Sequence, residues 1–76
     1  MKTFNQIINE MFKIQEAEIR DDLTPKDIPD WDSMNYLLFI AELEKNFSLT
    51  FSMDEVINAK CVGDLRKIIE VRGKTA

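Results

Sequence analysis

The chain of 76 residues contains no histidine, a single cysteine, and only two glycines and two prolines. Histidine is the side chain most often used as a general base near neutral pH, and it is also the commonest metal ligand. The lone Cys61 has no partner for an intrachain disulfide. These absences count against a hydrolytic enzyme, a zinc site and a disulfide-stabilised domain, so we expect a protein that is not an enzyme.

Long hydrophobic runs are also absent, and no segment approaches the roughly 20 apolar residues that span a bilayer. The first residues, Met1 to Gln6, lack the apolar centre of a secretion signal. We therefore expect a cytoplasmic protein without membrane insertion.

Charge is unevenly distributed along the chain, whose net charge is −4. Residues 16–32 hold seven acids and two bases, whereas residues 59–76 hold five bases and two acids. An acidic centre repels phosphate backbones, which excludes nucleic acid as an expected partner. The acidic segment would attract proteins with basic patches. The alternative is that its charges only keep a small domain soluble.

Helical periodicity predicts a single domain over residues 1–76, because 45% of the residues are hydrophobic and one small core is all this length allows. Thr3 and Gln6 form a capping-box pattern that begins a helix over about 3–14. Its apolar residues fall at helical spacing and predict a buried stripe: Phe4, Ile7, Ile8, Met11 and Phe12.

Residues 15–32 are rich in turn formers and contain both prolines, which predicts a long loop. Four spaced apolar residues should anchor this loop to the core: Ile19, Leu23, Ile28 and Trp31. Further helices are expected over 33–47, over 53–58 after a second capping box at Ser52 and Glu55, and over 62–72. The predicted fold is all-α, a monomeric small four-helix bundle of three main helices and one short one, with a long ordered loop between the first two.

Two faces are predicted for the helix over 33–47. One is apolar and should face the core: Tyr36, Phe39, Ile40, Leu43 and Phe47. The opposite arc carries Met34, Leu38 and Ala41, flanked by Asn35 and Glu42. Exposed apolar side chains clustered there favour a partner-docking face, since each one buried is worth roughly 1.5–3 kcal/mol.

Ser33 lies where the acidic loop meets this helix, directly after Asp32. It has no neighbouring base, so it fits a handle that another enzyme modifies better than a nucleophile of its own. From local sequence alone the favoured interpretation is an N-cap, a role that serine fills well.

The segment Trp31-Asp32-Ser33-Met34 and the helix after it resemble the attachment site of acyl carrier proteins. The resemblance extends through Leu43-Glu44-Lys45-Asn46-Phe47 and Val62-Gly63-Asp64-Leu65, and so covers the chain. It implies that a phosphopantetheinyl transferase, with magnesium and coenzyme A, attaches 4′-phosphopantetheine to Ser33. Asp32 would assist that reaction.

The resemblance further implies that the arm carries acyl groups as thioesters between loading enzymes and acyl-group-using enzymes. Fatty acyl cargo could fold back between the second and third helices, lined by four residues: Tyr36, Phe39, Ile40 and Leu43. Large aromatics could instead fill that space and leave short cargo outside.

Two departures from carriers of fatty-acid biosynthesis bear on the pathway. Asp30 stands where a glycine is common, and Asn35, Leu38 and Lys45 stand where acids are common. A less acidic face should recognise a different partner set, such as that of a secondary-metabolite, polysaccharide-modifying or amino-acid-loading pathway. The alternatives are an aminoacyl or peptidyl carrier, and an unmodified helical adaptor binding through Met34, Leu38 and Ala41.

Overall fold

The first helix, α1 (Phe4–Phe12), begins at the predicted capping box. The Gln6 backbone N–H donates to the Thr3 hydroxyl at 3.1 Å, and the Thr3 N–H donates to the Gln6 side chain at 2.9 Å. The helix ends earlier than the predicted residue 14, because Lys13 adopts a left-handed conformation with φ 60°. The Asn9 side-chain amide then donates to the Ile14 carbonyl at 2.8 Å and holds this turn.

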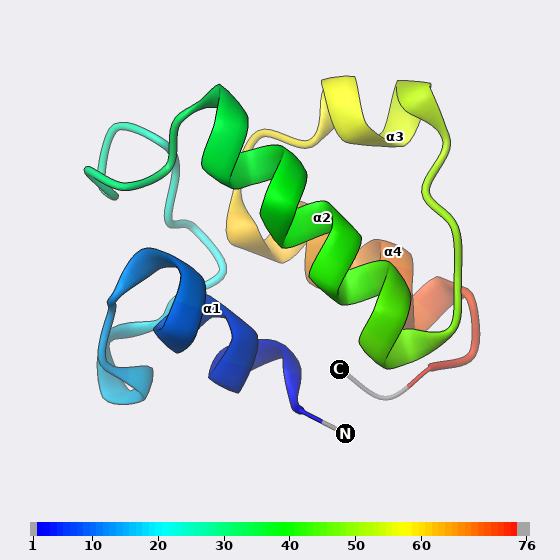
Figure 1. Cartoon of the computed structure of the whole chain (residues 1–76), viewed down its shortest axis with the longest axis horizontal. Helices are drawn as coiled ribbons and strands as arrows, with labels where there is room; N and C mark the ends of the chain where they lie inside the picture. The colour runs from blue at the N-terminus through cyan, green and yellow to red at the C-terminus, as the bar shows by residue number, and fades with distance from the viewer. Residues whose placement is uncertain (1, 75–76) are drawn as a thin grey trace.

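A computed structural model describes residues 2–74, so the ends of the predicted domain, 1 and 75–76, lie outside the described residues. After α1 come a short 3₁₀ turn η1 (Glu16–Glu18), α2 (Ser33–Phe47), α3 (Met53–Asn58) and α4 (Val62–Val71) (Figure 1). The predicted all-α fold of three main helices and one short helix is confirmed. None of the helices within residues 2–74 is long and apolar enough to cross a membrane.

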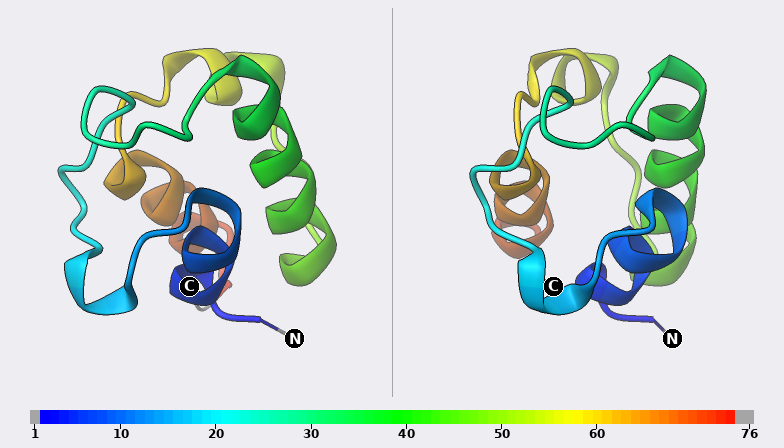
Figure 2. Two further views of the ribbon diagram at one scale, coloured as in Figure 1. Left: turned by 60° about the vertical axis from the view of Figure 1, so that its left-hand side comes forward. Right: turned by 90° about the vertical axis from the view of Figure 1, so that its left-hand side faces the viewer.

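The core lies among α1, α2 and α4, while α3 lies across the end of the molecule at which α2 begins (Figures 1 and 2). Phe39 is fully buried and contacts Phe4 and Phe12, with ring centroids 5.9 and 5.0 Å apart. The buried hydrophobic residues come from every main helix, from the long loop and from the connection between α2 and α3: Phe4, Ile7, Ile8, Phe12, Leu23, Ile28, Trp31, Phe39, Ile40, Leu43, Phe47, Phe51, Val62, Leu65 and Ile69.

The long loop is ordered by its docking onto the start of α4. The first backbone N–H groups of a helix have no partner within the helix, so they can bind other acceptors. Here the Val62 N–H donates to the Leu23 carbonyl at 2.9 Å, and the Gly63 N–H donates to the Asp21 carbonyl at 2.8 Å. Leu23 is buried, as its role as an anchor requires.

Arg66 of α4 connects the loop to α1. Its guanidinium donates to the Asp21 carboxylate at 2.9 Å and to the Asn5 side chain at 2.8 Å, and it lies 4.6 Å from the centre of the Phe4 ring. The Arg66 side chain is 21% exposed and the Asp21 side chain 68%, so this ion pair is partly open to solvent and adds little stability by itself.

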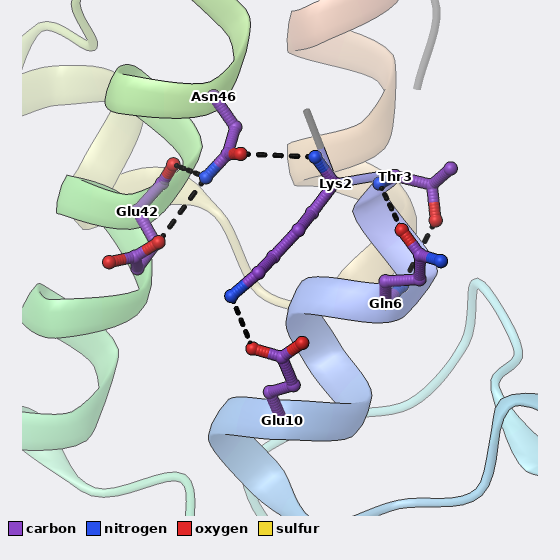
Figure 3. Close-up of polar contacts among 6 residues, drawn as sticks. All are labelled: Lys2, Thr3, Gln6, Glu10, Glu42 and Asn46. Carbon is purple, nitrogen blue, oxygen red and sulfur yellow. Dashed lines mark hydrogen bonds and ion pairs between the residues drawn. The ribbon is translucent and has the colours of Figure 1, made fainter.

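Polar contacts also join the start of the chain to the end of α2 (Figure 3). The Lys2 backbone N–H donates to the Asn46 side chain at 3.1 Å, and the Asn46 amide donates to the Glu42 carbonyl at 2.9 Å. The Lys2 ammonium pairs with Glu10, about two helix turns along α1. These bonds fix the crossing of α1 and α2 at the end of α2 farthest from Ser33.

We predict that Gly63→Ala destabilises the fold by about 1–3 kcal/mol, despite the better helix propensity of alanine. A Cβ at this position would lie 2.8 Å from the Asp21 Cβ and 2.9 Å from its carbonyl oxygen. The loop would have to move away from α4. Urea unfolding measures the loss, and Lys67→Ala, an exposed change on the same helix, should stay within about 0.5 kcal/mol of the parent. Equal stability of the two variants would contradict tight docking of the loop.

Candidate functional site

Ser33 is the first residue of α2, and Asp32, not Ser33, caps the helix. The Asn35 backbone N–H donates to the Asp32 carboxylate at 2.8 Å. The interpretation of Ser33 as the N-cap is therefore wrong. Within residues 2–74 the exposed Ser33 hydroxyl makes no hydrogen bond, so its oxygen is available for reaction without loss of the cap.

Trp31 holds the loop against the first turn of α2. Its ring stacks on Phe12 at 5.5 Å and contacts Tyr36 at 5.7 Å, and only 8% of the residue is exposed. A residue before the cap that packs against the fourth helical residue forms a hydrophobic staple, which fixes how the chain enters the helix. The predicted anchoring role of Trp31 is confirmed.

Asn35 braces the loop from the helix side. Its side-chain amide donates to the Asp30 carbonyl at 2.8 Å, and the Asp32 backbone N–H donates to the same carbonyl at 3.1 Å. Asn35 is half-buried, so the structure gives this residue, which was expected to bind partners, a structural contact within the loop.

The electrostatics at Ser33 favour an anion. The start of a helix carries a partial positive charge, and its first N–H groups point outward. A phosphate ester on the Ser33 oxygen would lie at this position. The chain has no histidine, so it offers Ser33 no imidazole base.

Ser33 lines an open groove of about 590 Å³. The groove lies between the end of the loop, the first turns of α2, and α3. Its lining is mainly apolar: Pro25, Trp31, Asp32, Ser33, Tyr36, Leu37, Met53, Val56, Ile57 and Ala59. Its volume falls within the roughly 300–1,000 Å³ of small-molecule sites.

Of the four residues expected to line a cargo space, only Tyr36 lines this groove. Phe39, Ile40 and Leu43 are 0%, 6% and 0% exposed and belong to the core. Phe39 contacts Phe4 and Phe12 of α1. That these three residues line a cargo space stays a prediction. α3 contributes the groove lining instead.

Tyr36 makes the one hydrogen bond between α2 and α3 found in residues 2–74. Its hydroxyl donates to the Val56 carbonyl at 2.8 Å. Burial raises the pKa of this phenol, and the negative charge of Asp64 adds to the rise. The hydroxyl therefore stays protonated and able to donate at neutral pH.

The apolar surface beside Ser33 is larger than the sequence predicted. Met34 and Leu38 are 73% and 52% exposed, as expected, and Ala41 is exposed beside them. Leu37, which is 60% exposed, was missed. It lies four residues after Ser33, a spacing that puts both residues on one helix face and could have identified it.

Met53 and Ile57 of α3 extend this surface, with 72% and 65% of each residue exposed. Glu42, by contrast, is half-buried, and its carboxylate accepts from the Asn46 amide at 3.2 Å. We call the five large exposed side chains Met34, Leu37, Leu38, Met53 and Ile57 the apolar face. Its α3 residues follow α2 after a short connection, and they lie beside the start of α2 only in the folded chain.

No family model and no curated protein sequence matches the chain. Among solved structures, a Mycobacterium tuberculosis protein assigned as an acyl carrier protein matches with a TM-score of 0.80 and 26% sequence identity. The match covers 91% of this chain and 92% of that one. The chain has the acyl carrier protein fold.

The acyl carrier fold agrees with the resemblance drawn from the residues around Ser33. The match extends over nearly the whole chain, so it includes the long loop and α3 as well as the two main helices beside them. This likeness supports a carrier role for the chain, since folds of this kind serve proteins that hold groups for other enzymes.

We predict that Asp32→Ala destabilises the fold by about 1 kcal/mol, because it removes the carboxylate that caps α2. Ser33→Ala should change stability by less than about 0.5 kcal/mol, since its hydroxyl makes no bond within the described chain. Urea unfolding of both variants at pH 7 makes the comparison. A larger loss for Ser33→Ala than for Asp32→Ala would show that Ser33 is the cap after all.

Proposed function

We propose that the protein is a carrier on which 4′-phosphopantetheine is attached to Ser33 and holds acyl groups as thioesters. The observation that carries this proposal is the exposed Ser33 hydroxyl, released from capping by Asp32, at the mouth of an apolar groove in an acyl carrier fold. A fold alone does not give a function, so the serine and its surroundings carry the argument.

Attachment requires a transferase, because this chain has no base for the serine. The Ser33 oxygen forms a bond to the phosphorus that bears the pantetheine of coenzyme A. The pyrophosphate bond breaks, adenosine 3′,5′-bisphosphate leaves, and the serine proton passes to the transferase. Asp32 lies next to Ser33 and keeps its carboxylate on the Asn35 N–H, so it holds the first turn of α2 in shape during this reaction.

Once formed, the phosphodiester is stabilised by the start of α2. The first N–H groups of the helix and the helix dipole favour its negative charge. The arm keeps its cargo at a high effective concentration near a docked enzyme, which is how a protein without catalytic groups serves several reactions.

Partner enzymes would dock on the apolar face beside Ser33. The first nine residues of α2, from Ser33 to Ala41, carry no charge. Acids are nearby in the loop, where Asp27 and Asp32 are exposed. A partner that fits this surface has an apolar centre and basic residues at the rim. Enzymes that recognise an acidic α2 would bind it poorly, so we place the carrier in a specialised cytoplasmic pathway.

We predict that incubation with coenzyme A, magnesium and a broad-specificity phosphopantetheinyl transferase adds one phosphopantetheinyl group to the protein. Intact-mass spectrometry measures the gain, and Ser33→Ala should abolish it. Ser48→Gly is the matched control, because glycine tolerates the φ of 54° at that exposed serine. No gain on the folded parent protein would reject the carrier proposal in favour of an unmodified adaptor.

We predict that Leu37→Ser lowers kcat/KM of the transferase for this protein by roughly 10- to 100-fold, if each buried side chain gives about 1.5–3 kcal/mol. Val71→Ser is the control, since Val71 is 78% exposed but lies on α4, away from Ser33. Both variants should unfold within about 0.5 kcal/mol of the parent. Equal kcat/KM for the two variants would remove Leu37 from the docking surface.

A further inference from the structure

Tyr36 lies between Ser33 and the core. It follows Ser33 by one helix turn, its ring contacts Trp31 at 5.7 Å, and its hydroxyl bonds to the Val56 carbonyl. Any group that is tethered at Ser33 and passes between α2 and α3 toward the core has to pass this side chain. The Tyr36 ring and its hydrogen bond therefore form the inner wall of the groove.

The space behind Tyr36 is occupied by side chains. Phe39, one turn further along α2, is fully buried and contacts both Phe4 and Phe12. Leu43 and Leu65 are also fully buried. Interiors of this kind are close-packed, so a chain can enter only if these side chains move.

We infer that Tyr36 blocks the entry of an acyl chain into the core. This carrier therefore takes short acyl groups, which stay in the surface groove beside Ser33. This inference rests on the proposed function and specifies its substrate class. A long acyl chain that entered would break the bond from Tyr36 to the Val56 carbonyl and leave a partly buried acceptor without a partner. It would also displace Phe39 from its two aromatic neighbours.

A short acyl group needs neither change. The groove is open to solvent along its length, and Leu37 and Ile57 give it apolar walls. The thioester then remains outside the bundle, where a docked enzyme reaches it without first extracting it. Tyr36 is therefore a specificity-determining residue, because it limits the length of the acyl chain that the carrier accepts.

The test uses chemical attachment, so it does not depend on a transferase. In a Cys61→Ser background, Ser33→Cys provides the only thiol, which is alkylated with an ethyl or a decyl chain on a linker of pantetheine length. Two-dimensional NMR then follows the amide signals of Leu37 and Ile57 in the groove and of Leu43 and Leu65 in the core. Thermal unfolding is measured on the same samples.

With Tyr36 intact, the decyl chain should shift only the groove signals and leave the melting temperature equal to that of the ethyl form. In Tyr36→Ala, the decyl chain should shift the core signals and raise the melting temperature above that of the ethyl form. Tyr36→Phe, which keeps the ring and loses only the hydrogen bond, should give a smaller shift of the same core signals. Asn46→Ala removes polar contacts at the far end of α2 and should behave like the parent.

Core shifts by the decyl chain in the parent would overturn the inference. So would unchanged core signals in both Tyr36 variants. Failure of the transferase reaction at Ser33 would instead reject the carrier role itself, and the two failures are measured in separate experiments.

Discussion

The packing of Trp31 between Phe12 and Tyr36 is the contact on which the site depends. Phe12 is the last residue of α1, Trp31 lies near the end of the loop, and Tyr36 lies in the first turns of α2. One buried indole thus sets the position of the loop relative to both helices. Aromatic rings bury large areas and prefer offset or tilted contacts, so this arrangement specifies an orientation as well as a distance. The place of Ser33 follows from it.

Around that contact, capping α2 and presenting a free hydroxyl are the tasks of different residues. Asp32 caps α2, Asn35 holds the carbonyl of the loop residue Asp30, and Ser33 keeps its hydroxyl exposed. A serine that capped its own helix would lose that bond on modification. Since the preceding aspartate supplies the cap, a group added to Ser33 leaves the hydrogen bonds of the helix start intact.

The loop is as much a part of the fold as the helices. Two backbone N–H groups of α4 hold its carbonyls, and Arg66 joins it to Asn5 and Phe4 of α1. The acidic residues of the loop are thereby presented at fixed positions, while the start of α2 stays uncharged. Charge and apolar surface are separated on adjacent elements, so a partner would meet an apolar centre with acids beside it.

The sequence by itself predicted the four helices, since α1, α2 and α3 begin at capping residues and α1, α2 and α4 carry periodic apolar stripes. It also placed Ser33 at the start of α2, and it identified Trp31 as an anchor. Local pattern did not distinguish Asp32 from Ser33 as the cap, because both residue types fill that role and the choice depends on where the loop enters the helix.

Tertiary structure alone decided which apolar residues line the groove beside Ser33. Phe39, Ile40 and Leu43 share a helix face with Tyr36, and periodicity treats all four alike. They differ because the first three are buried in the core, where Phe39 contacts Phe4 and Phe12 of α1, whereas α3 meets Tyr36 near the start of α2. The groove joins residues from the loop, α2 and α3, and its shape depends on how α3 crosses the bundle. That crossing arises from contacts between distant segments, which no local pattern encodes.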